Sequence, residues 1–207
     1  MKPILFSTPI VQAILIGNKT QTRRIVKNSG VLDMISQGFF YNAMMLGKYR
    51  VNDILWVRET WQHTKVLNIN PEDENYGYVY KADDQPWDDF EDWKWKPSIF
   101  MPKDACRIFL KISKIRIEQL EDITKEDAIA EGIESWEQMG TIRYKSYIEP
   151  MVGFWDDYDH SKIGGVHPAI ASYRSLWAKI NGHDSLKSNP WVFVYEFERI
   201  LQPNTNN

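Results

Sequence analysis

The sequence predicts one α+β domain: a mixed β-barrel of short strands with flanking helices and a tryptophan-rich insertion. Five segments have the apolar density or alternation of strands, and only two or three segments with helical spacing lie between them, which favours a mixed barrel over a regular βαβ sheet. The 207 residues contain no internal repeat and no low-complexity linker. We therefore expect a single domain over 1–207 with insertions around 62–100 and 134–167.

The expected strands are rich in β-branched and aromatic residues. A short first strand is expected at 3–6, and the barrel strands near 22–26, 53–61, 76–81, 107–118 and 191–197. Between 107 and 118 the apolar residues change parity at Ser113-Lys114. A parity change of this kind predicts either two strands or one strand with a bulge.

Helix start signals, apolar spacing and stop signals predict three helices. The first begins at Thr8-Pro9, with Thr8 as N-cap, and ends at Gly17. The second begins with the capping-box-like sequence TKED at 124–127 and ends at Gly132. The third covers 168–180. Segments 62–75, 82–100 and 140–166 are expected to be loops or insertions.

The composition, 43% hydrophobic and 26% charged, is that of a globular protein and excludes a disordered or fibrous chain. Cys106 is the single cysteine, which excludes an internal disulfide and a cysteine-based zinc site. The four histidines lack ligand spacing, so neither a metal nor a cofactor is expected. The chain has no apolar run long enough for a membrane span and no secretory signal, so a cytoplasmic protein without membrane contact is expected.

The net charge of -3 conceals alternating blocks of charge. Residues 1–50 hold seven basic residues and one acid (+6), and residues 66–95 hold nine acids and two lysines (-7). Residues 96–117 hold six basic residues and one acid (+5), and residues 118–140 hold eight acids and one lysine (-7). The blocks indicate either a polarised surface whose basic faces meet an anion or blocks that pair with each other in the fold.

The densest polar segment is Gly17–Arg24, GNKTQTRR, which joins a helix end to a strand. Its cations, hydroxyls and backbone amides suit a phosphate or another anion. A desolvated Lys19 would lose proton affinity and could act as a base toward a neighbouring hydroxyl such as that of Thr22. The alternative is a solvated edge strand, where lysine and threonine are common.

Two further candidates are Glu131 and a group of aromatic residues. Glu131 lies in the last turn of its helix, where the helix dipole disfavours a carboxylate; either a nearby lysine or substrate donor explains it, or the side chain is solvent-exposed. Trp56 and Trp61 flank Arg58-Glu59 on a strand, and aromatic faces beside cations can stack on bases. Tryptophan is also a common core residue.

Several segments together resemble the ASCH-domain proteins, and most closely the longer form found in phages and prophages. They occur in the expected order and span nearly the whole chain, from Ile4 to Phe197. The segments are ILFSTPIVQAILIGNKTQTRR, DILWVRETW, YKAD, KPSIFMP, RIFLKI, LEDITKEDAIAEGI and INGHDSLKSNPWVFVYEF. One departure is Asp104, where the family pattern has an aromatic residue.

The resemblance implies a PUA-like fold, a small β-barrel with flanking helices and a cleft under the barrel mouth. Relatives with this architecture commonly bind RNA or modified bases. A smaller bacterial ASCH protein is an amidohydrolase that deacetylates N4-acetylcytidine with a lysine, a threonine and a glutamate. Its G-x-K-x-x-T segment matches Gly17, Lys19 and Thr22, and its glutamate matches Glu131. The resemblance thus implies that these residues converge on one cleft.

Three functions are compatible with these observations. The first is a binding module for RNA or a modified nucleoside, in which Lys19, Arg23 and Arg24 contact phosphate or a base carbonyl and Trp56 or Trp61 stacks. The second is an amidohydrolase acting on an N4-acetylcytidine-type substrate through Lys19, Thr22 and Glu131. The third is a structural or host-interaction protein, which only the acidic, aromatic insertion supports.

Overall fold

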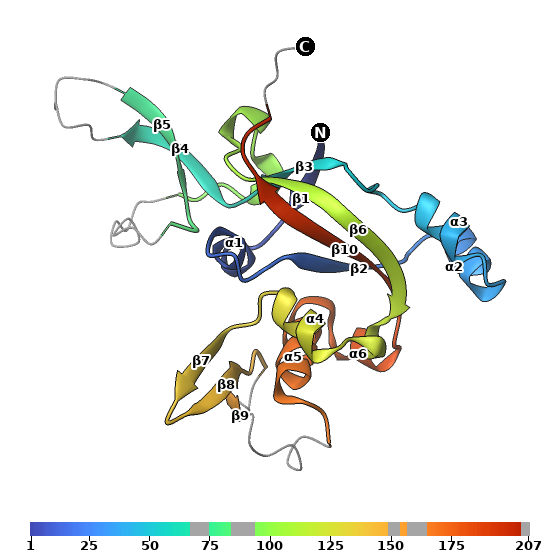
Figure 1. The fold of residues 1–207 in the computed structure, drawn as a ribbon. Coiled ribbons are helices and arrows are strands. Elements are labelled where there is room, and N and C mark those ends of the chain that lie inside the picture. The colour runs from blue at the N-terminus through green and yellow to red at the C-terminus, as the bar shows by residue number, and fades with distance from the viewer. Residues whose placement is uncertain (67–74, 84–93, 149–153, 157–164, 204–207) are drawn as a thin grey trace.

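The centre of the protein is a five-stranded mixed sheet (Figure 1). The computed structural model describes residues 1–66, 75–83, 94–148, 154–156 and 165–203. In the order β1-β3-β6-β10-β2, the strands are Lys2–Leu5 (β1), Ile54–Arg58 (β3), Phe109–Gln119 (β6), Trp191–Ile200 (β10) and Gln21–Ile25 (β2). Strands β1 and β3 are parallel, and the other neighbours are antiparallel. The predicted α+β class is confirmed.

The predicted closed barrel is wrong for the described strands, because β1 and β2 are the two edges of the sheet. Helix α1 (Thr8–Leu15) connects these edges, and its Val11 and Ile14 are buried in the core. The edge strands have only four and five residues. Where they approach each other, a side chain replaces the backbone ladder: Arg24 Nη2 donates to the Leu5 carbonyl at 3.1 Å.

Helices cover both faces of the sheet, and β10 separates two apolar cores. Phe193, Tyr195 and Phe197 lie in a core with α1, α2 (Ser29–Ser36) and α3 (Phe40–Met45). Val192 and Val194 lie in a second core with α4 (Lys125–Ala130) and α5 (Pro168–Asn181). This alternation follows from the period of two along a strand. The α4 and α5 helices lie below the sheet in Figure 1.

The parity change in the sequence is a bulge within one long strand. Pairing of β6 with β10 shifts register between Glu196, which is opposite Lys114, and Phe197, which is opposite Ile112. Ser113 is therefore the extra residue, as expected from the second of the two alternatives. Because of the bulge, Ile112 and Ile115 both contribute to the same core.

The predicted strand at 53–61 is two strands that belong to different sheets. Strand β3 ends at Arg58, and β4 (Trp61–Val66) pairs with β5 (Asn75–Tyr80) in a separate hairpin. The predicted strand at 76–81 is thus β5, outside the central sheet. Figure 1 shows this hairpin projecting from the body of the protein.

The remaining elements fall in segments without a clear period. Strands β7 (Ser135–Gln138), β8 (Thr141–Lys145) and β9 (Phe154–Asp156) form a third sheet within the predicted insertion at 134–167. The helices missed by the sequence are α2, α3 and α6 (His183–Lys187). Short 3-10 helices are η2 (Ser98–Phe100), η3 (Lys103–Ala105) and η4 (Leu120–Asp122).

Two further predictions from the sequence concern the tryptophan-rich insertion and the absence of a membrane span. The predicted tryptophan-rich insertion includes Trp87 and Trp93, which lie outside the described residues. In the described part of the chain, no helix combines the length and the apolar character needed to cross a membrane.

Gly132 provides a test of how α4 is fitted against the first helix. Its φ is +81°, and an added Cβ would lie 2.8 Å from Lys19 Cβ and 3.0 Å from Ala13 Cβ. We expect Gly132→Ala to lower the free energy of unfolding by about 2–4 kcal/mol, because backbone strain adds to overpacking. Gly140→Ala is the control: its φ is +75°, but nothing lies within 4 Å. Equal losses in urea denaturation would show that the close approach contributes nothing.

Candidate functional site

The polar segment after α1 is fixed by backbone hydrogen bonds from both sides. The amides of Asn18 and Lys19 donate to the Ala13 carbonyl at 2.9 and 3.1 Å, which ends α1. The Thr20 amide then donates to the Ala130 carbonyl at 2.9 Å, and the Thr20 carbonyl accepts from the Phe197 amide at 2.8 Å. The segment is therefore held between the end of α4 and strand β10, where it enters β2.

Lys19 and Glu131 form a buried ion pair. Lys19 Nζ donates to Glu131 Oε2 at 2.8 Å and to the Glu131 carbonyl at 2.7 Å. Both residues are only 4% exposed, so the contact is shielded from water. Glu131 is the C-cap of α4, the position that disfavours a carboxylate. Of the alternatives that the sequence left open for Glu131, the structure shows a nearby lysine and excludes simple solvent exposure.

The same carboxylate also holds Arg23. Arg23 Nη1 lies 3.1 Å from Glu131 Oε1, so each oxygen of Glu131 binds a different cation. Arg23 Nη2 also contacts Glu118 Oε1 at 2.5 Å and Asp127 Oδ2 at 3.1 Å. The Arg23 side chain has no exposed surface. Because three protein carboxylates neutralise its charge, Arg23 has no free charge for the ligand-binding role expected for it.

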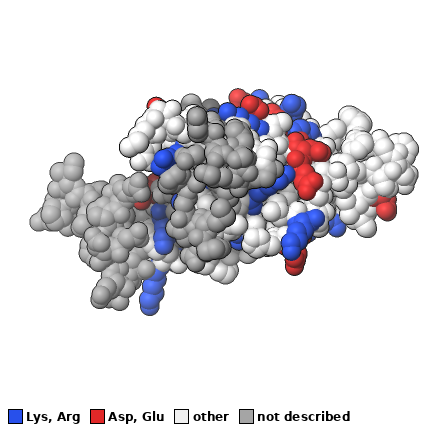
Figure 2. All heavy atoms as spheres, turned by 90° about the horizontal axis from the view of Figure 1, so that it is seen from below, with Lys and Arg blue, Asp and Glu red and all other residues white. Residues whose placement is uncertain are grey.

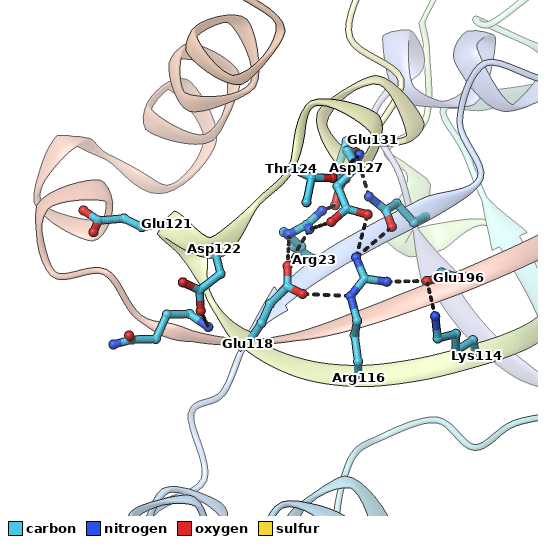
Figure 3. A network of polar contacts seen from close by, with 12 residues as sticks. Arg23, Lys114, Arg116, Glu118, Glu121, Asp122, Thr124, Asp127, Glu131 and Glu196 are labelled. Carbon is cyan, nitrogen blue, oxygen red and sulfur yellow. Dashed lines mark hydrogen bonds and ion pairs between the residues drawn. The ribbon is translucent and has the colours of Figure 1, made fainter. Parts of the chain in front are cut away.

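Arg116 closes the network from strand β6 (Figure 3). Its Nε lies 2.7 Å from Glu118 Oε2, and its Nη2 lies 2.6 Å from Asp127 Oδ1. Arg116 also pairs with Glu196, and Gln21 Nε2 donates to the Asp127 carbonyl at 2.6 Å. Two arginines are therefore bridged by the same two acids. Such shared, hydrogen-bonded charges suit a rigid scaffold.

These contacts show how the alternating charge blocks are used. Arg23 comes from the first basic block and Arg116 from the second, and the two acids that they share, Glu118 and Asp127, come from 118–140. Likewise Arg107 pairs with Asp83 of the first acidic block at 2.7 Å. On the underside of the molecule, basic and acidic side chains lie near one another (Figure 2). The blocks thus pair with each other at these positions.

A cavity of about 370 Å³ opens beside the Lys19–Glu131 pair. Its apolar lining includes Phe6, Tyr173 and Trp177. It is also lined by Leu5 of β1 and Thr22 of β2, and so lies where a closed barrel would join these two edges. Its volume is within the range of small-molecule sites.

Thr22 supplies the hydroxyl of the site. It is 5% exposed and lines the cavity, and among the described residues its hydroxyl has no hydrogen-bond partner. Thr22 is opposite Tyr195 in the sheet, whereas Arg23 is opposite Val194, so the two side chains point to opposite faces. The hydroxyl is therefore available to a ligand while its neighbour belongs to the polar network.

Burial changes the acid–base properties of the site. Desolvation lowers the pKa of Lys19, although Glu131 opposes this shift. The positive charges of Arg24 and Arg23 lower the pKa of Lys19 further. Burial, reinforced by the charge of Glu131, raises the pKa of Tyr173 well above its usual value, so its hydroxyl stays a donor. The cavity wall thus offers donors, one carboxylate and a lysine with weakened proton affinity.

The remaining sequence candidates do not line this cavity. Glu59 is 1% exposed and forms a bidentate ion pair with Arg107 at 3.0 and 2.9 Å. Trp61 is 6% exposed and packs in a core cluster with Met101 and Phe109, so its ring faces are not free for a base. Arg58 lies over the Trp56 ring at 5.4 Å and donates to the Ile99 carbonyl. These four residues form a separate, structural cluster.

The sequence did not single out several residues that build the site. Phe6 and Tyr173 have the same apolar spacing as core residues, and no local signal separates them from the core. Glu118 and Asp127 lie in an acidic block, and their alignment with Arg23 depends on strand register. Opposite Val194 of β10 lie both Arg23 of β2 and Arg116 of β6, and this cross-strand row could have been found only from the correct pairing.

Comparison of the chain with protein-family models, with curated proteins and with solved structures gives no match. The ASCH resemblance therefore continues to rest on the sequence segments alone. Among the described residues there is also no group of three or more His, Cys, Asp or Glu side chains that could hold a metal ion.

The polar network predicts unequal roles for two adjacent arginines. Arg23→Met should lower the free energy of unfolding by about 3–5 kcal/mol, because Glu131, Glu118 and Asp127 would each lose one of two cations in a largely buried network. Arg24→Met is the matched control, since Arg24 is exposed and the Leu5 carbonyl is its only hydrogen-bond partner among the described residues; its loss should stay below about 1 kcal/mol. Urea denaturation of both variants measures the difference, and equal losses would contradict the assigned roles.

The network also predicts acid sensitivity. Burial alone would raise the pKa of Asp127, but its hydrogen bond to Arg116 and the charge of Arg23 lower it below the usual value. A carboxyl group with a lowered pKa stabilises the fold above its unfolded pKa of about 3.9, and this contribution is lost as the pH falls through the lower folded value. Asp127→Asn should therefore flatten the loss of stability below about pH 4 in denaturation series. An unchanged pH profile would contradict the prediction.

Proposed function

We propose that the cavity between the sheet edges is a binding site for a modified nucleoside, free or within RNA, in a PUA-like fold. The observation that carries the proposal is that the Thr22 hydroxyl, which has no hydrogen-bond partner among the described residues, lines the same cavity as the buried Lys19–Glu131 pair. All three residues line one cavity, and they occupy the positions that match the ASCH motif.

The chemistry of the lining supports a nucleobase as ligand. Phe6, Tyr173 and Trp177 provide aromatic surface, on which a base can pack. Lys19 has three N–H donors, of which two go to Glu131, so one remains for a base or acyl carbonyl. The Thr22 hydroxyl can both donate and accept. Such a small set of polar groups on an apolar wall is typical of an orienting ligand site.

Binding of N4-acetylcytidine, measured by calorimetry against cytidine and uridine, tests the proposal. We expect N4-acetylcytidine to bind most tightly, and Thr22→Val to weaken it about five- to tenfold through the loss of one hydrogen bond. Thr20→Val is the control, because this exposed threonine two residues away does not line the cavity. Absence of binding by all three nucleosides, or equal losses in the two variants, would refute the proposal.

A second candidate function is hydrolysis of the acylated amine, and the lowered pKa of Lys19 favours it. A neutral Lys19 could take a proton from water or from Thr22 for attack on the acyl carbon, and protonated Lys19 could stabilise the oxyanion. Cleavage of the C–N bond then requires a proton for the leaving nitrogen, which Glu131 could relay. Attack by water gives acetate and cytidine directly. Attack by Thr22 releases cytidine and leaves an acetyl-threonine ester, which a water molecule must then hydrolyse to release acetate.

Release of cytidine by the purified protein, followed by chromatography, distinguishes the two functions. For an enzyme, Thr22→Ser should retain part of the rate, Lys19→Met should abolish turnover, and the rate should rise with pH as Lys19 loses its proton. Glu131→Gln is preferable to alanine here, because Glu131 also holds Arg23 and its truncation would unfold part of the network. Binding without turnover would identify a reader of the modification.

A further inference from the structure

The cations around the cavity fall into an inner and an outer set. The inner set, Lys19 and Arg23, is buried and paired with carboxylates. The outer set, Arg24 and Lys27, is exposed, and neither forms an ion pair with the described residues. Both outer cations line the cavity.

The Arg24 side chain is oriented by contacts that do not neutralise its positive charge. Its guanidinium lies 5.4 Å from the centre of the Phe6 ring, and Lys19 Nζ lies 5.9 Å from the same ring. Among the described residues its hydrogen-bond partner is the Leu5 carbonyl, which takes one of its five N–H groups. Arg24 therefore stands beside the inner site as a pre-oriented donor, and Lys27 lies three residues further along the chain.

The lining as a whole has an excess of positive charge. Four cations and one carboxylate line the cavity, namely Lys19, Arg23, Arg24, Lys27 and Glu131. Glu118 and Asp127 complete the balance for Arg23 from outside the lining. No described acid performs this function for Arg24 or Lys27, so an anionic group on the ligand would be attracted to this side of the cavity.

We propose that Arg24 and Lys27 form a phosphate subsite, so that the ligand of the cavity is a nucleotide whose base lies beside Lys19 and Thr22. This inference rests on the proposed function and specifies its ligand class. The phosphate is either a terminal 5′-phosphate or the phosphodiester of an RNA strand, since both present the same anionic oxygens. Arg23, which the sequence grouped with Arg24, takes no part because its charge is already neutralised.

Calorimetry with N4-acetylcytidine, its 5′-monophosphate and a short RNA containing the modified base tests the subsite. The 5′-phosphate should tighten binding about tenfold or more at low salt, and the gain should shrink as salt rises. Arg24→Ala/Lys27→Ala should remove the gain and leave affinity for the free nucleoside within about twofold. A gain for the RNA but not for the monophosphate would assign the subsite to the phosphodiester.

The control variant is Lys48→Ala/Lys103→Ala. It also removes two exposed cations, and Lys48 lies over the Tyr49 ring at 5.1 Å much as Arg24 lies over Phe6, but neither residue lines the cavity. This variant should keep the phosphate gain. Equal affinity for nucleoside and both phosphorylated ligands, or a gain that survives in Arg24→Ala/Lys27→Ala, would overturn the subsite while leaving nucleoside binding intact. Failure of every ligand to bind would overturn the proposed function and the subsite together.

Discussion

The Glu131 carboxylate is the point on which the site and the surrounding fold depend. It binds Lys19 through one oxygen and Arg23 through the other, and both cations are removed from water. A buried cation without a partner costs several kcal/mol, so this contact fixes the end of α4 against the segment that enters β2. Arg23 then transmits the constraint to Glu118 and Asp127, and through them to Arg116. Through these contacts one carboxylate connects the end of α4 with strands β2 and β6.

The contact with Glu131 also explains why neighbouring residues of β2 have different roles. Side chains alternate between the two faces of a strand, so Arg23 points to the carboxylates under α4 while Thr22 and Arg24 point to the opposite face. The sheet is open at this edge, and the cavity occupies the gap between β1 and β2. Thr22, Arg23 and Arg24 all line the cavity, and Arg23 also belongs to the polar network.

Local periodicity was sufficient to predict β2, β6, β10 and the helices α1, α4 and α5 to within a few residues. Glu131 could also be singled out from the sequence, because the helix dipole makes a carboxylate unusual in the last turn of a helix. The open edges of the central sheet and the separation of β4 from β3 could not be predicted, since strand pairing depends on distant segments. The structural role of Arg23 and the core position of Trp61 could be assigned only from the fold. The sequence alone does not distinguish a buried side chain from one that contacts a ligand. Helix α2 was missed although Asn28 caps it and the buried Val31 and Ile35 lie one turn apart, whereas α3 has a single buried residue, Ala43.

The bulge at Ser113 determines where the protein can tolerate insertions and deletions. Before the bulge, Leu110 and Ile112 face the core under α1; after it, Ile115 and Ile117 do so. Arg116 and Glu118 reach the polar network only because the extra residue shifts the phase of the strand. A single-residue deletion here would turn these two charges toward the apolar core and two isoleucines toward the carboxylates. Length variation among related chains should therefore be suppressed within this strand and confined to segments outside the central sheet, such as the β4–β5 and β7–β8 hairpins.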